Sequence, residues 1–224
     1  MKQQIANIIT LISLCLGTIS ILESCNLNFV LSSYLILICF LLDGLDGSLA
    51  RFFNTNSKYG QQLDSLADMT AFGIAPGILM YNYISVNFNL EHAYVALSIP
   101  IFSALRLAYY NTYNNGRGSF KGLTTPVSAL LFVSIPLIQE HETNKTILDL
   151  INNQYLIVGL VIVTSILLTM PFETFELRLD NLKNNKKKLF FIIFSVSILY
   201  IFKFTGLPIV ILCYIILCIT KYIN

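Results

Sequence analysis

Four aspartates between positions 43 and 68 have the chemistry and the spacing of a cation site. Asp43 and Asp46 are three residues apart and Asp64 and Asp68 are four apart, so each pair shares one face of a helix. If the two helices are antiparallel neighbours, all four carboxylates point at each other and cannot all stay ionised without a cation. Because every ligand is an oxygen, a hard divalent ion such as Mg²⁺, Mn²⁺ or Ca²⁺ suits the cluster better than Zn²⁺.

Small residues and an arginine accompany these acids. Gly47 and Ala50 continue the face of the first pair, and Gly60 precedes the second pair on its own face. Together they leave room for a bulky ligand beside the cations. Arg51 adds a planar guanidinium group that suits phosphate. The combination indicates a site for a diphosphate held through metal ions.

The composition places this cluster in a membrane protein. Of 224 residues, 55% are hydrophobic and 12% are charged, whereas a soluble domain carries about 25% charged residues. The mean hydropathy is +0.71 and the net charge is only +2. These values exclude a disordered chain, a nucleic-acid-binding protein and a disulfide-stapled secreted module. The five cysteines lie in or beside apolar runs without CxxC spacing, which argues against a zinc site.

Apolar runs recur along the whole chain and set the expected fold class. They predict an all-α, polytopic membrane helix bundle with about eight transmembrane helices. The first run is expected to be a retained span and not a cleaved signal peptide. The last two runs are short and joined by a tight turn around Lys203, which predicts a helical hairpin. The candidate spans are 5–23, 29–47, 66–86, 92–111, 122–139, 155–171, 188–202 and 204–220.

Positive charges predict the orientation of these spans. With a cytoplasmic N-terminus and eight crossings, all of the 14 Lys and Arg residues except Lys145 and Lys203 fall on the cytoplasmic side. Such a bias is what the positive-inside rule describes. We therefore expect both termini and the acidic site to lie at the cytoplasmic face of the cell membrane.

The stretch from Asp43 to Asp68 resembles the signature of the CDP-alcohol phosphatidyltransferase family, D-x2-D-G-x2-A-R-x8-G-x3-D-x3-D, at every fixed position. The resemblance implies an integral membrane enzyme, commonly a homodimer with a six-helix core. Such an enzyme transfers a phosphatidyl or similar group from a CDP-linked donor to an alcohol and releases CMP. The resemblance also implies that the four aspartates hold two divalent metal ions and that Asp68 is in addition the general base. By the same resemblance, the CDP part is accommodated by Gly47, Ala50, Arg51 and Gly60.

Further stretches resemble the members of this family whose acceptor is serine. They are 63–76, 104–111 and 120–126, and Asn7-Ile-Ile-Thr10 is similar to the start of those proteins. The similarity covers about residues 5–180, which divides the chain into a core over 1–180 and a C-terminal helical hairpin over 181–224. It implies CDP-diacylglycerol and L-serine as substrates, with phosphatidylserine and CMP as products. The acyl chains of the donor would lie among the membrane lipids.

A serine acceptor needs a cation for its carboxylate. Arg106 and Lys121 are the candidates on the cytoplasmic side, with Asn111 as a hydrogen-bond partner. The same cations are also explained by membrane orientation and interfacial snorkelling. Two other functions stay open: a transferase of this fold that uses glycerol phosphate or inositol, and a cation transporter. The transporter is disfavoured because the acids gather at one membrane edge and do not follow a path across it.

Overall fold

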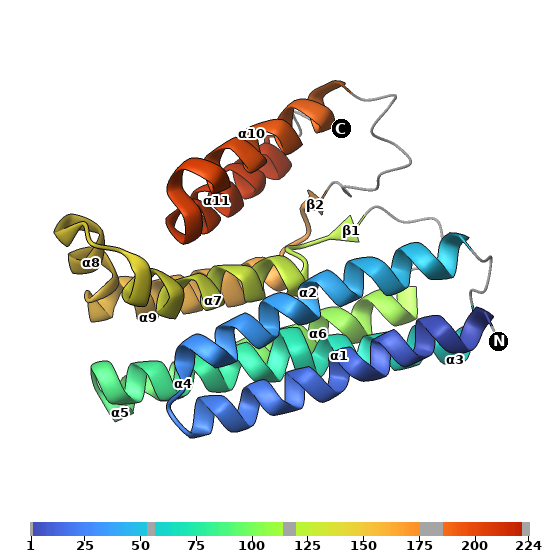
Figure 1. Cartoon of the computed structure of the whole chain (residues 1–224), viewed down its shortest axis with the longest axis horizontal. Coiled ribbons are helices and arrows are strands. Elements are labelled where there is room, and N and C mark those ends of the chain that lie inside the picture. Colours follow the sequence, from blue (N-terminus) through green and yellow to red (C-terminus); the bar gives the residue numbers. More distant parts are fainter. Residues whose placement is uncertain (1, 53–56, 114–119, 175–185, 221–224) are drawn as a thin grey trace.

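A computed structural model describes residues 2–52, 57–113, 120–174 and 186–220 (Figure 1). Helices account for nearly all of this part of the chain. In order, the elements are α1 (Lys2–Cys25), α2 (Phe29–Phe52), α3 (Lys58–Asp68), the π-helical turn η1 (Met69–Ile74), α4 (Ala75–Asn87), α5 (Leu90–Ala93), the 3-10 turn η2 (Tyr94–Leu97), α6 (Ser98–Tyr113), β1 (Phe120–Lys121), α7 (Thr125–His141), α8 (Lys145–Ile151), α9 (Gln154–Thr169), β2 (Glu173–Thr174), α10 (Lys186–Phe202), the 3-10 turn η4 (Lys203–Thr205) and α11 (Gly206–Ile219).

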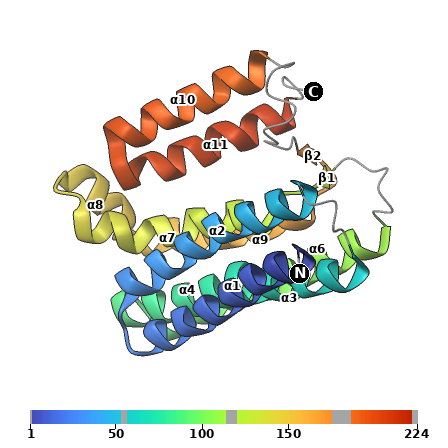
Figure 2. The ribbon, with the colours of Figure 1, turned by 45° about the vertical axis from the view of Figure 1, so that its right-hand side comes forward.

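The expected all-α membrane bundle is confirmed. Five helical runs among the described residues are long and apolar enough to cross a membrane, or six if α8 and α9, bent by 62°, form one span. One of the five is 187–219, in which α10 and α11 fold back on each other at η4 (Figures 1 and 2). All eight predicted spans correspond to helices, although fewer runs pass the length and hydropathy test. Of the shorter helices, α7 has 17 residues and α11 has 14. Both fall short of the roughly 20 residues that a separate perpendicular crossing needs.

The first two helices form an antiparallel hairpin that packs across the third helical run. The chain reverses at Leu27, whose φ of 65° lies in the left-handed region. Along the hairpin, the Ser20 and Ser32 hydroxyl groups are 2.9 Å apart and buried. Where α1 crosses η1, a Cβ on Gly17 would lie 3.0 Å from the Cα of Ala71. Glycine at position 17 therefore permits the close approach that brings α1 against the helix following the second acid pair.

The third helical run begins earlier than its apolar residues suggest. Span 66–86 was expected, whereas α3, η1 and α4 form a continuous helix from Lys58 to Asn87. Ser57 caps its start by accepting a hydrogen bond from the Gly60 amide at 3.0 Å. The polar first part carries Asp64 and Asp68. Hydropathy therefore detects only the apolar part of the helix, and the acidic part is a direct extension of it.

The C-terminal hairpin lies on one side of this bundle, over α7 and β2 (Figure 2). Its contact is an apolar cluster that includes Tyr214, Ile211 and Phe191 from the hairpin and Leu123 and Leu168 from the bundle. The predicted boundary between core and hairpin, at residues 180 and 181, lies outside the described residues.

Candidate active site

Three of the predicted acids meet between α2 and α3. Asp43, Asp64 and Asp68 each offer a carboxylate oxygen, and these oxygens all lie within 4.8 Å of one another. Asp64 and Asp68 lie one turn apart on α3, and Asp43 approaches them from α2. All three are partly buried. Three oxygens at this separation can share one cation, and an all-oxygen donor set suits a hard divalent ion.

Asp46, the fourth acid, turns toward α1. It is 6% exposed, and its Oδ2 accepts a hydrogen bond of 2.6 Å from the hydroxyl group of Thr10. Its charge still interacts with that of Asp64. The structure thus gathers three acids around one point and places the fourth beside them, held by α1. Thr10 is not among the predicted site residues, although it falls in the Asn7–Thr10 stretch that resembles the family.

The small residues behave differently from one another. Gly60 faces α1, because a Cβ there would lie 3.4 Å from the side-chain oxygen of Asn7. Gly47 is partly buried on α2, one residue beyond Asp46. The side chains of Ala50 and Arg51 lie outside the described residues.

Two of the three predicted acceptor residues border the acidic cluster. Arg106 is 7% exposed on α6, and its Nη1 donates to the Thr125 hydroxyl group at 3.3 Å. Its charge interacts with that of Asp68. Asn111, five residues further along α6, donates from Nδ2 to the Ser65 hydroxyl group at 3.0 Å. α6 therefore lies along the acid-bearing helix and brings a cation and an amide to the cluster.

The third predicted acceptor residue, Lys121, lies on β1, and its side chain is outside the described residues. The backbone around it is well defined. β1 pairs antiparallel with β2, with Phe120 opposite Thr174. The next residue, Gly122, has a φ of +82°, and its amide donates to the Phe172 carbonyl at 2.8 Å. A Cβ on Gly122 would collide with the carbonyl oxygen of Leu168, so this turn requires glycine.

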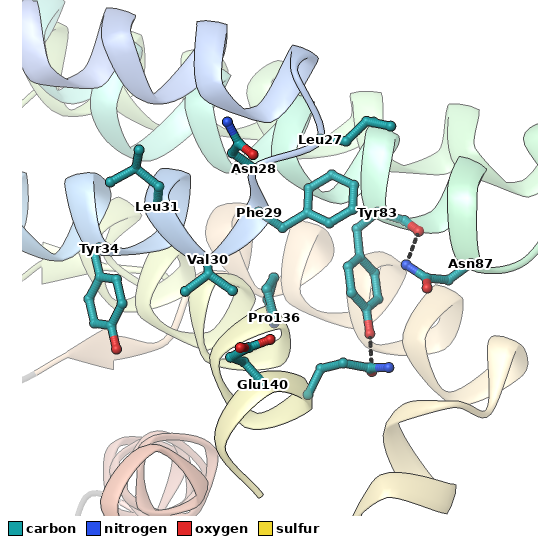
Figure 3. A pocket seen from close by; sticks show the side chains of 11 residues that line it. Leu27, Asn28, Phe29, Val30, Leu31, Tyr34, Tyr83, Asn87, Pro136 and Glu140 are labelled. Carbon is teal, nitrogen blue, oxygen red and sulfur yellow. Dashed lines mark hydrogen bonds between the residues drawn. The ribbon is translucent and has the colours of Figure 1, made fainter.

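A cavity also lies in another part of the described chain. It has a volume of about 700 Å³ and opens where the α1–α2 turn meets the ends of α4 and α7 (Figure 3). There the Tyr83 hydroxyl group donates to the side-chain oxygen of Gln139 at 2.7 Å. Phe29 and Tyr34 line it near the start of α2, about 14 Å or more along the helix from Asp43. This cavity is therefore separate from the acidic cluster and no part of the candidate active site.

The fold and the site define a multi-pass membrane protein that presents clustered carboxylates beside a buried arginine. Comparison with known proteins gives its family. Residues 3–167 match the model of the CDP-alcohol phosphatidyltransferase family. The chain belongs to this family and is an enzyme of it.

Curated relatives agree with this assignment. The chain is 37% identical over 168 residues to a Helicobacter pylori protein named CDP-diacylglycerol–serine O-phosphatidyltransferase, covering 71% of this chain and 69% of that one. It is 35% identical over 148 residues to a Methanocaldococcus jannaschii protein of the same name, covering 66% and 68%. It is also 32% identical over 133 residues to the archaetidylserine synthase of Methanothermobacter thermautotrophicus, covering 58% and 57%.

Proposed function

We propose that this enzyme transfers the phosphatidyl group of CDP-diacylglycerol to L-serine, which gives phosphatidylserine and CMP. Relatives from bacteria and archaea carry names that include serine as the acceptor. The observation that carries the proposal is the position of Arg106, which is buried on α6 with its charge interacting with Asp68. A fixed guanidinium group suits a carboxylate, and serine has a carboxylate whereas inositol has none.

Asp43, Asp64 and Asp68 would hold the divalent metal, because their oxygens are close enough to share an ion. Asp46, beside them, would complete a set for two ions, with Mg²⁺, Mn²⁺ or Ca²⁺ as the matching class. When bound, such ions would neutralise the charge of the donor diphosphate and of the departing CMP. Gly47, Ala50, Arg51 and Gly60 are proposed to surround the CDP part.

The transfer itself forms one bond and breaks another at the same phosphorus. The serine hydroxyl oxygen attacks the phosphorus that carries diacylglycerol, and the bond from this phosphorus to the CMP oxygen breaks. Asp68 accepts the proton of the serine hydroxyl group as the new bond forms, since Asp68 belongs to the acidic cluster and lies beside the acceptor residues. The serine carboxylate pairs with Arg106, while Asn111 and Lys121 supply further polar contacts.

The setting of the reaction is part of the same proposal. The positive charges of the chain favour the cytoplasmic face of the cell membrane for the site and for both termini. The donor would enter from the surrounding membrane lipids with its acyl chains in the apolar layer. The proposed organisation is a homodimer in which each chain has a core over 1–180 and an appended hairpin over 181–224.

The test is an acceptor assay with the purified protein in detergent. CDP-diacylglycerol would be supplied with Mg²⁺ or Mn²⁺ and, in separate reactions, serine, glycerol phosphate or inositol. We expect phosphatidylserine and CMP in equal amounts with serine, loss of both on chelation, and recovery on adding back the metal. Release of CMP only with another acceptor would overturn the serine assignment. Cation flux in liposomes without any CMP release would overturn the transferase itself.

An arginine substitution tests the acceptor site. We expect Arg106→Ala to raise the serine KM by about 10-fold or more, because a charge-assisted contact contributes roughly 1.5–3 kcal/mol. The KM for CDP-diacylglycerol should change little. An unchanged serine KM would contradict the role given to Arg106.

A further inference from the structure

The C-terminal hairpin lies beyond residues 3–167, the part that matches the family, yet it contacts the acceptor side of the bundle. Helix α11 packs against α7 and β2, and these are the elements that flank the segment from Phe120 to Thr125. Leu123 of this segment is fully buried in the same apolar cluster as Tyr214 and Ile215 of α11. The hairpin therefore packs against a segment that contributes to the proposed acceptor site.

Tyr214 is the polar residue at the centre of this contact. It is 6% exposed, and its ring lies 6.2 Å from that of Phe191 on α10. Its hydroxyl group lies within hydrogen-bonding reach of the side chains of Thr174 and Cys218. A buried tyrosine whose hydroxyl group has a partner on another element fixes position as well as filling space. Here the partner, Thr174, is itself buried and belongs to β2.

A short chain of contacts leads from Thr174 to Arg106. Thr174 lies opposite Phe120 in the β1–β2 pairing, so β2 sets the position of β1. The chain then turns at Gly122 and reaches Thr125, which is fully buried and accepts the hydrogen bond from Arg106. Tyr214 is thus connected to the arginine through the strand pair and the segment that follows it.

We propose that Tyr214 is a positioning residue for the acceptor. Through Thr174 and the strand pair, it holds segment 120–125 and so fixes the Arg106 guanidinium group for the carboxylate of the incoming amino acid. The hairpin is accordingly a part of the acceptor site that the family core lacks on its own. This inference rests on the proposed function, since it assigns Arg106 to acceptor binding.

Tyr214→Phe tests the proposal because it keeps the ring and removes only the hydroxyl group. We expect the serine KM to rise about two- to tenfold, the value of one hydrogen bond, with the KM for CDP-diacylglycerol unchanged. Thr174→Val should act in the same way, and the double variant should cost less than the sum of the two single changes, because both remove the contact that the two side chains share. The matched control is Tyr200→Phe, since Tyr200 lies on the same hairpin and is 87% exposed.

The outcomes separate positioning from simple packing. An unchanged serine KM, or equal rises in both KM values with a fall in Tm, would overturn the positioning role and leave Tyr214 as a core residue. Additive effects of the two substitutions would overturn the route through Thr174. If the wild-type enzyme uses another acceptor, the serine assignment fails, and the same comparison with that acceptor then decides the role of Tyr214.

Discussion

The hydrogen bond from Thr10 to Asp46 gives a sharp prediction about the acidic site. Thr10→Val keeps the shape of the side chain and removes the hydroxyl donor. In the wild type, this donor lies 2.6 Å from Asp46 Oδ2 in a buried setting, which is the length of a charge-assisted bond. Losing it removes one of the contacts that orient a carboxylate beside the proposed metal site.

The magnitude follows from the kind of bond. A hydrogen bond to a charged group contributes about 1.5–3 kcal/mol, which corresponds to roughly 10- to 100-fold in an equilibrium constant. A second comparison gives the same range: removing a partner that orients a metal-binding side chain typically lowers metal affinity or activity by about 10- to 100-fold. We therefore expect Thr10→Val to raise the Mn²⁺ concentration needed for half-maximal activity by about 10- to 100-fold. Thr10→Ser, which keeps the hydroxyl group, should stay near the wild type.

The assay is a titration of CMP release with Mn²⁺ at saturating CDP-diacylglycerol and serine. Thr18→Val is the matched control, because Thr18 lies on the same helix and its exposed hydroxyl group donates only to the Leu14 carbonyl at 2.9 Å. A metal titration for Thr10→Val that superimposes on the wild type would refute the reasoning. So would an equal shift in the Thr18→Val control, since that would indicate a general effect on α1.

Three further predictions concern the base, a turn and a surface contact. Asp68→Asn should lower turnover by about 10²–10⁴-fold, the usual contribution of a general base, while CDP-diacylglycerol binding measured directly largely persists. Gly122→Ala should lower the Tm by an amount that reflects more than about 1 kcal/mol, because the residue has a φ of +82° and a Cβ would meet Leu168. The pKa of Glu142 is lowered in the folded protein by hydrogen bonds from the Thr205 hydroxyl group and from the backbone amides of residues 144 and 143. The stabilisation from this carboxylate is therefore full above its ordinary pKa of 4.5 and is lost as the pH falls. The Tm difference between wild type and Glu142→Gln should therefore shrink as the pH is lowered from 7 toward 4.

Each of these has a result that would contradict it. Wild-type turnover in Asp68→Asn would remove the base from the mechanism. For the turn, Gly159→Ala is the control, since a Cβ on Gly159 of α9 meets nothing within 4 Å, and an equal loss in both variants would contradict the reasoning. A Tm difference for Glu142→Gln that grows on acidification would show that the sign of the linkage is wrong.

The spacing of the acids predicted most of the site but not the direction of Asp46. Residues three apart on a helix differ by about 60° around its axis, which counts as one face when the helix is viewed alone. On α2, that angle is enough for Asp43 to turn toward α3 while Asp46 turns toward Thr10 on α1. The identity of the neighbouring helix decides such a choice, and the sequence does not show which helix that is.

The acceptor side was harder to predict than the acidic side. Arg106 and Asn111 could be selected because both lie on the expected cytoplasmic side in the stretch 104–111, which resembles members of the family, and the structure places both near α3. Tyr214 is about a hundred residues away in an apolar run, where a tyrosine gives no sign of a polar contact. Its partner on β2 depends on a two-residue strand that no hydrophobic period can reveal.

The π-helical turn η1, which begins immediately after Asp68, constrains how this gene can vary. Such a turn holds one residue more than an α-helical turn, so it offsets the angular phase of everything downstream by about 100°. The acids lie before this offset, and the fully buried residues Leu79 and Met80 lie after it. Lineages of this protein should therefore tolerate exchanges of residue type within Met69–Ile74 far better than a change in its length, since a single-codon deletion would turn one half of the helix away from its neighbours.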